Sequence, residues 1–241
     1  HMAKEALEEI YSHHRIPIIA GGTGFYIQAL LYDIDFKEND DESLVRRELE
    51  ELAAREGEAA PAVLHAMLEE IDPESAARIH ANNVKRVIRA IEYYRLTGER
   101  ISVHNQEERV KESPYNFLYY VVNTQRPVLY GRIDRRVDQM MENGLVEEVQ
   151  ALKAMGCHRG QTSMQGLGYK EILDYLDGRC TLDEAVYILK RDTRHFAKRQ
   201  LTWFKRERDV RWLNLPDFGN DAASVVERII EDCVGAGIVL Q

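Results

Sequence analysis

Cysteine is scarce in this chain of 241 residues, and its distribution excludes two classes of protein. Cys157, Cys180 and Cys233 lie far apart, and none belongs to a Cys-x-x-Cys pair. Neither a disulfide framework nor a zinc module is therefore indicated, and a reducing compartment fits the composition. The eight histidines show no H-x-x-x-H or H-E-x-x-H spacing, so no metal-ligating residues are predicted.

Long apolar runs are missing as well. No segment approaches the roughly 18 to 20 uninterrupted apolar residues that span a bilayer, and the first residues lack the pattern of a secretory signal. We therefore expect a monomeric cytoplasmic protein without membrane contact. His1-Met2 resembles the remnant of an expression tag, so we expect the natural chain to begin upstream.

The phosphate loop of Walker-type proteins, G-x-x-x-x-G-K-[ST], occurs nowhere in the chain. A different glycine cluster, Gly21-Gly22-Thr23-Gly24, follows an apolar run. Glycine permits close approach of a ligand, and a threonine hydroxyl can contact a phosphate or a nucleotide there. A purely structural turn explains the cluster equally well.

Positive charge is in deficit, since 32 Lys and Arg face 41 Asp and Glu, and the net charge is −9. Taken alone, this excess of acid argues against a nucleic-acid partner. The distribution argues otherwise, because residues 189–206 contain seven basic residues and one acid, Asp192. The helix predicted over residues 182–206 carries an apolar stripe and, opposite it, a basic ridge of Arg191, Arg194, Lys198 and Lys205. This ridge could meet phosphate or be an ordinary solvated face.

The order of segments predicts a helix-rich α/β protein. A helix at residues 3–13, a buried strand at 15–20 and a helix at 24–31 come first. Residues 41–109 show no strand pattern, and breaks at 56–57, 71–73 and 97–98 divide them into helices. Strands are expected again at 116–123 and 210–215, and a last helix is expected at the C-terminus. Between the strands we expect helices at 126–155, with a candidate break at Asn143-Gly144, at 170–177 and at 182–206.

Two further segments could contact phosphate. Residues 165–170 form a polar, glycine-containing loop before a helix, which can bring backbone N–H groups close to a phosphate or base. An ordinary helix connection is the alternative. On the helix after the second strand, Arg132, Arg135 and Arg136 could clamp a diphosphate, or they could form helix salt bridges such as Arg135 with Asp138.

Five segments, in this order along residues 17–212, resemble motifs of the tRNA dimethylallyltransferase family, also called tRNA isopentenyltransferases. They are Gly-Gly-Thr-Gly-Phe-Tyr at 21–26, Asn-Val-Lys-Arg-Val-Ile-Arg-Ala-Ile-Glu at 83–92, Arg-Ile-Asp-Arg-Arg-Val at 132–137, Gln-Gly-Leu-Gly-Tyr-Lys at 165–170 and Ala-Lys-Arg-Gln-Leu-Thr-Trp at 197–203. The resemblance implies a P-loop NTPase-like α/β core, incomplete at its N-terminus, with a helical insertion domain. The core would comprise residues 1–40 and 113–241, and the insertion residues 41–112.

The resemblance also implies an activity. Enzymes of this family transfer the dimethylallyl group of dimethylallyl diphosphate to the exocyclic N6 of the adenosine adjacent to the anticodon, and diphosphate leaves. The target base must be flipped out, because a stacked base hides that nitrogen. The partners would be the anticodon stem-loop of a tRNA and dimethylallyl diphosphate as co-substrate.

Site residues follow from the matching positions. Thr23 would contact the flipped adenosine, and Arg132 and Arg136 would lie near the diphosphate. The residues expected to bind tRNA are Thr23, Arg46, Lys85, Arg86, Arg89, Gln165, Gly166, Gly168, Tyr169, Lys170, Lys198, Arg199, Gln200, Thr202, Trp203 and Lys205.

The family's first segments are missing from this sequence. They are a strand, a Walker-type phosphate loop that binds ATP-like phosphates, and an Asp-Ser-Met-Gln segment whose aspartate serves as general base; the Mg²⁺ site goes with them. We therefore expect a piece of a longer enzyme, shorter by roughly 80 residues, that does not catalyse by itself. The alternatives are a fragment that binds the anticodon arm without catalysis and a relative that prenylates free adenine nucleotides, which would not need the insertion.

Overall fold

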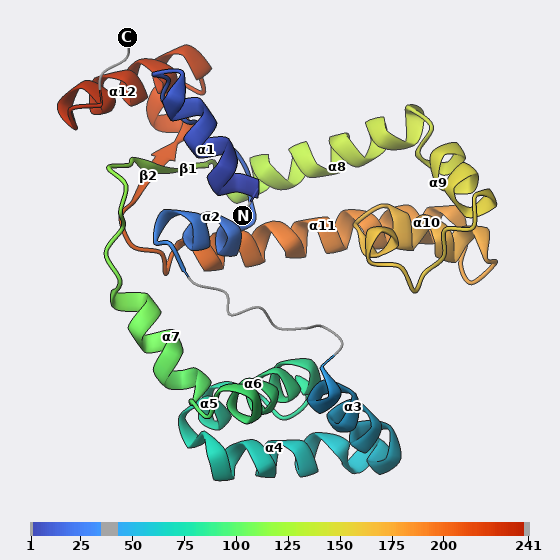
Figure 1. Cartoon of the computed structure of the whole chain (residues 1–241). Helices are drawn as coiled ribbons and strands as arrows, with labels where there is room; N and C mark the ends of the chain where they lie inside the picture. Colours follow the sequence, from blue (N-terminus) through green and yellow to red (C-terminus); the bar gives the residue numbers. More distant parts are fainter. Residues whose placement is uncertain (1, 35–42, 239–241) are drawn as a thin grey trace. The chain divides into compact units, whose positions relative to one another are not determined.

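The computed structural model describes residues 2–34 and 43–238 (Figure 1). The chain divides into two compact units, one made of His1–Gly24 with Phe117–Gln241 and the other of Phe25–Asn116. The second unit is therefore inserted into the sequence of the first. The predicted domain boundary between residues 40 and 41 lies outside the described residues, and the domain bounds stay a prediction.

The unit of residues 25–116 is helical in all its described regular elements. These are α2 (Gly24–Leu31), α3 (Leu44–Glu56), η1 (Gly57–Ala59), α4 (Ala60–Ile71), α5 (Pro73–Arg78), α6 (Val84–Thr97) and α7 (Ile101–Val110). The three predicted helix breaks are confirmed, and Gly98, with a φ of 73°, ends α6 in the left-handed region that favours glycine. Leu49, Leu64 and Val87 lie in a core built from α3, α4 and α6.

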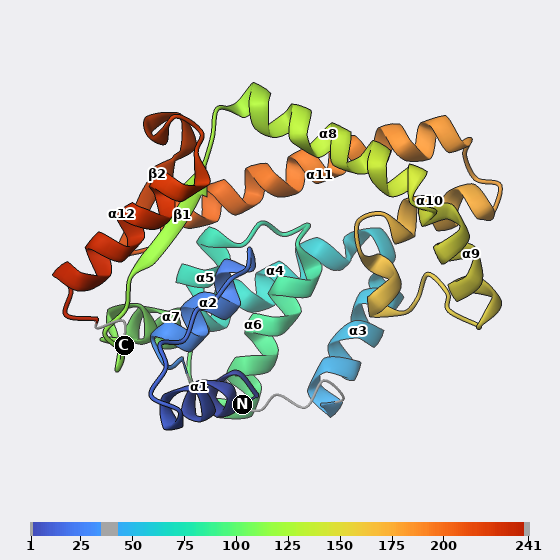
Figure 2. The same ribbon diagram turned by 90° about the horizontal axis from the view of Figure 1, so that it is seen from above.

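The other unit combines a small sheet with long helices. Its elements are α1 (Met2–Ser12), β1 (Tyr119–Asn123), α8 (Arg126–Glu142), α9 (Leu145–Ala154), η2 (Thr162–Gln165), α10 (Tyr169–Leu176), α11 (Leu182–Phe204), β2 (Val210–Asn214), η3 (Leu215–Phe218) and α12 (Ala222–Gly235). β1 and β2 are parallel, in a register that pairs Tyr119 with Val210. Helix α8 runs alongside α11 in both views (Figure 2). The predicted helix-rich α/β class is confirmed.

The buried strand predicted at residues 15–20 is wrong. This segment has no strand structure, and Ile18 is 88% exposed, with Ile16 and Ile19 also exposed. A β-branched run favours a strand only where a neighbouring strand supplies hydrogen bonds and a packing surface. The sheet of the described chain consists of β1 and β2, which pair with each other and not with this segment.

A buried carboxylate links two helices of the helical unit. Asp72, 1% exposed, caps α5 by accepting hydrogen bonds from the backbone N–H and hydroxyl of Ser75. It also accepts from the N–H and hydroxyl of Ser102 at the start of α7. Burial alone would raise the pKa of Asp72, but these four hydrogen bonds outweigh it and hold the pKa below its ordinary value.

We expect Asp72→Asn to destabilise the protein by about 1–3 kcal/mol at neutral pH. Each carboxylate oxygen of Asp72 accepts a hydrogen bond from a backbone N–H, and the NH₂ group that replaces one of these oxygens in asparagine cannot accept one. The pKa of Asp72 is lowered by folding. Its contribution is therefore present at neutral pH and lost as the pH falls through the folded-state pKa. Thermal unfolding of both proteins against pH measures this, and the two curves should converge in acid. The change Glu70→Gln, at an exposed residue two positions away, serves as control, and an equal loss for both variants would contradict the assignment.

Candidate functional site

The glycine cluster at residues 21–24 packs against the C-terminal half of α11. Nε2 of Gln200 donates a hydrogen bond of 2.7 Å to the carbonyl oxygen of Gly22. A Cβ atom at Gly22 would lie 2.3 Å from that nitrogen, and a Cβ atom at Gly24 would lie 2.2 Å from Cδ1 of Trp203. Both distances are too short for real side chains. The rigid Trp203 ring therefore requires glycine at residue 24, whereas at residue 22 the flexible end of Gln200 would have to move.

Thr23 lies exposed between these two packed glycines. Its neighbours on both sides are held by Gln200 and Trp203, so the backbone that carries the Thr23 side chain is fixed. The motif at residues 21–26 and the motif at residues 197–203, which are far apart in the sequence, are thus in contact. Gln200 and Trp203 were expected to bind RNA, and the structure places both half-buried against the loop.

The basic residues of α11 fall into two groups. From the N-terminus to just past the middle of the helix, two of them pair across to α8: Lys190 with Asp138 at 2.5 Å and Arg194 with Asp134 at 2.5 Å. Arg191 pairs with its neighbour Asp192. The open basic ridge predicted for this part of the helix is therefore largely neutralised.

The C-terminal half of α11 keeps its charge. Lys198, Arg199 and Lys205 are exposed, and none of them forms an ion pair with an acid in residues 2–34 or 43–238. The guanidinium of Arg199 lies 5.8 Å from the ring centroid of Phe196. This end of the helix combines uncompensated cations with an exposed aromatic ring, a surface that suits phosphates and bases.

Two arginines on α8 are exposed in the same way. Asp138 is engaged by Lys190, so the predicted alternative of a salt bridge from Arg135 to Asp138 is not formed. Arg132 and Arg136 lie one helical turn apart, and neither pairs with a carboxylate in the described part of the chain. Both guanidinium groups can therefore accept an anionic ligand.

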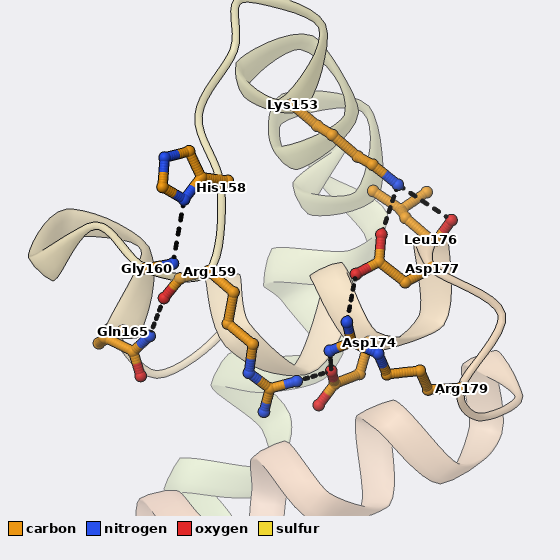
Figure 3. A network of polar contacts seen from close by, with 9 residues as sticks. All are labelled: Lys153, His158, Arg159, Gly160, Gln165, Asp174, Leu176, Asp177 and Arg179. Carbon is orange, nitrogen blue, oxygen red and sulfur yellow. Dashed lines mark hydrogen bonds and ion pairs between the residues drawn. The ribbon is translucent and has the colours of Figure 1, made fainter. Parts of the chain in front are cut away.

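The loop before residue 165 is fixed by polar contacts (Figure 3). The side-chain amide of Gln165 donates to the backbone carbonyl of Arg159, and the guanidinium of Arg159 pairs with Asp174 near the end of α10. Arg179 binds the same carboxylate at 2.9 Å. Gln165 was expected to bind RNA, but in this structure its amide holds the loop.

The glycine motif at 165–170 continues into α10 with an internal cap. Gly168, with a φ of 104°, donates its N–H to Oε2 of the buried Glu171 at 2.9 Å. The hydroxyl of Tyr169 donates to Glu148, and this hydrogen bond raises the pKa of Tyr169. Lys170 pairs with Glu171 at 3.3 Å. Gly166 and its neighbour Gln165 remain exposed, so the exposed part of this motif is its start.

In the helical unit, two of the four residues predicted to bind RNA are exposed and two lie near a buried carboxylate. Lys85 and Arg86 are exposed in the first turn of α6. Arg46 and Arg89 approach Glu92, a carboxylate that is 0% exposed. The sequence reasoning missed Glu92. Helical spacing was the available signal, because residues 85, 89 and 92 share one face of α6.

A metal site is not found in the described part of the chain. No group of three His, Cys, Asp or Glu side chains there is placed to hold an ion. No described residue is therefore assigned to the Mg²⁺ that the resemblance implies. None of the described helices is both long enough and apolar enough to cross a bilayer.

Known proteins similar to this chain agree with one another. A family model described as "IPP transferase" matches residues 1–207. The tRNA dimethylallyltransferase of Lachnoclostridium phytofermentans is 60% identical over 94% of this chain and 72% of its own length. That of Acetivibrio thermocellus is 48% identical over 96% and 71%. The solved structure of full-length tRNA isopentenylpyrophosphate transferase from Bacillus halodurans has a TM-score of 0.65 and 40% identity, covering 98% of this chain and 71% of that one.

We expect Gly24→Ala to destabilise the unit that contains α11 by about 1–3 kcal/mol, since the added methyl group overlaps the rigid Trp203 ring. Gly21→Ala is the matched control, because nothing lies within 4 Å of a Cβ atom there. Thermal melting of both variants gives the comparison. Equal melting temperatures would show that the loop does not pack on Trp203, and adding Trp203→Leu to Gly24→Ala should restore part of the loss.

Proposed function

The chain belongs to the IPP transferase family, and on that premise we propose that it is a tRNA dimethylallyltransferase that prenylates N6 of the adenosine adjacent to the anticodon. The observation that carries the proposal is the packing of the Thr23 loop against Gln200 and Trp203. This packing places the exposed hydroxyl of Thr23 beside α11, whose C-terminal half carries the cations without a carboxylate partner. Because the substrate is tRNA, we assign the reaction to the cytoplasm.

We propose that the anticodon stem-loop is held by cations that have no carboxylate partner. On α11 these are Lys198 and Arg199, with Lys205 at its C-cap, and on α6 they are Lys85 and Arg86. Phosphate contacts of this kind supply most of the affinity and fix the register of the RNA. The exposed backbone at Gly166 is a further contact, since a glycine permits close approach.

In the proposed reaction, the N6 amine of the flipped adenosine attacks the allylic carbon of dimethylallyl diphosphate. A new C–N bond forms, the C–O bond to diphosphate breaks, and the amine loses a proton. Thr23 would orient the base through its hydroxyl, because the loop that carries it is fixed on both sides. Arg132 and Arg136 would stabilise the charge that develops on the leaving diphosphate.

Mg²⁺ would be bound together with the diphosphate, whose oxygens it commonly coordinates. No described residue is assigned to it, and no step is assigned through it. The division into a core of residues 1–40 and 113–241 and a helical insertion of residues 41–112 is part of the same proposal, as are the remaining tRNA contacts at Arg46, Arg89, Tyr169, Lys170 and Thr202.

The transfer is tested with the natural full-length protein, dimethylallyl diphosphate labelled in its prenyl group, and an unmodified tRNA transcript. We expect label in the tRNA and loss of about 10²-fold in rate for Arg132→Ala or Arg136→Ala, since each removes a cation from the leaving group. Arg135→Ala is the control on the same helix. Binding of tRNA without transfer by intact protein would replace the proposal with the binding-only alternative.

The RNA surface is tested separately by the salt dependence of tRNA affinity. Lys198→Ala should weaken binding and reduce the slope of log K against log salt by about 1, because one phosphate contact is lost. Lys190→Ala removes the same charge from the same helix, but Lys190 is already paired with Asp138 and its slope should change little. Equal changes for the two lysines would contradict the division of α11 into a neutralised half and an open half.

A further inference from the structure

Glu92 is a charged side chain that the proposed reaction does not use. It lies in the middle of α6 with none of its surface exposed. The guanidinium of Arg46 donates to Oε2 from both Nε, at 3.2 Å, and Nη2, at 2.6 Å. The hydroxyl of Ser43 donates to the other carboxylate oxygen, Oε1. A second arginine, Arg89, places Nη1 4.0 Å from Oε2.

These contacts join the start of one helix to the middle of another. Ser43 is the N-cap of α3, and its hydroxyl oxygen accepts the N–H of Arg46 while the hydroxyl group donates to Glu92. Glu92 therefore fixes the first turn of α3 and the direction of the Arg46 side chain together. A two-point contact from a planar guanidinium defines an orientation as well as a distance.

Glu92 lies beneath a basic surface. Arg89 lies one turn before it and Lys85 two turns before it on the same face of α6, and Arg86 is exposed beside them. A carboxylate placed there lowers the local positive charge. A buried negative charge weakens the attraction of this surface for a polyanion, so Glu92 must serve another purpose.

The other buried carboxylate of this unit behaves differently. Asp72 is bound by Ser75 and Ser102 and serves to join α5 to α7. None of the contacts found for it in the described chain comes from a cation. Asp72 therefore offers an internal comparison between a carboxylate that joins helices and one that also orients an arginine.

We infer that Glu92 is a positioning residue for tRNA binding, which holds Arg46 in the orientation that meets an RNA phosphate. This rests on the proposed function, because Arg46 is a tRNA contact only if the chain binds tRNA. The benefit of an oriented guanidinium exceeds the cost of one negative charge beneath the surface. Removing the carboxylate should therefore weaken RNA binding even though the protein becomes more positive.

Two variants test this inference by the affinity for an unmodified tRNA transcript across a range of salt concentrations. Glu92→Gln keeps the size of the side chain but removes its charge, and Arg46→Lys keeps the charge but not the two-point contact. Each should weaken binding about tenfold, the size of one lost charge-assisted contact, and lower the salt slope by about 1. The double variant should bind tRNA with about the same affinity as the single variant that binds less tightly, because both substitutions remove the same interaction.

Asp72→Asn is the matched control. It should lower the melting temperature but leave the tRNA affinity, measured below that temperature, within about twofold of wild type. Should Glu92→Gln fail to fold, Arg46→Lys still decides the matter, because Glu92 keeps a cationic partner in that variant.

Each opposite result removes the inference. Tighter or unchanged binding by Glu92→Gln would mean that Glu92 acts only as a charge, and unchanged binding by Arg46→Lys would mean that orientation does not matter. An equal loss of affinity for Asp72→Asn would reduce Glu92 to a structural role. If the wild-type protein does not bind tRNA at all, the proposed function fails and this inference fails with it.

Discussion

The contact between the glycine loop and α11 is the constraint on which the candidate site depends. Gly22 accepts a hydrogen bond from Gln200, and at Gly24 the backbone lies so close to the rigid Trp203 ring that no side chain fits between them. This contact places the hydroxyl of Thr23 on a fixed backbone beside the basic end of α11. Without it, the motifs would be separate features of the sequence rather than parts of one site.

Ion pairs determine which cations remain for a ligand. The acids of α8 neutralise α11 to just past its middle through Asp134 and Asp138, and the rest of its C-terminal half is left charged. The same pairs leave Arg132 and Arg136 without carboxylate partners in the described chain, although Asp134 and Asp138 lie within two residues of them in the sequence. A protein with a net charge of −9 can therefore present a local surface that suits RNA.

Local signals predicted the helices well, because apolar spacing and breaks such as Asp72-Pro73 act over a few residues. The strand expected at residues 15–20 was wrong because a strand depends on neighbours that a local pattern does not contain. The motifs placed Thr23 and Gln200 in the candidate site but not their contact with each other. Glu92 was missed because an acid among basic residues on a helix reads as a surface ion pair, and burial is set by the crossing helix α3.

The inserted position of the helical unit has a consequence for how the chain folds during synthesis. Residues 25–116 form contacts within their own segment, so this unit can assemble as soon as it has been made. The glycine loop must wait for Gln200 and Trp203, which are translated long afterwards. Until then the loop lacks its packing partner, a period in which chaperones would have the greatest effect on yield.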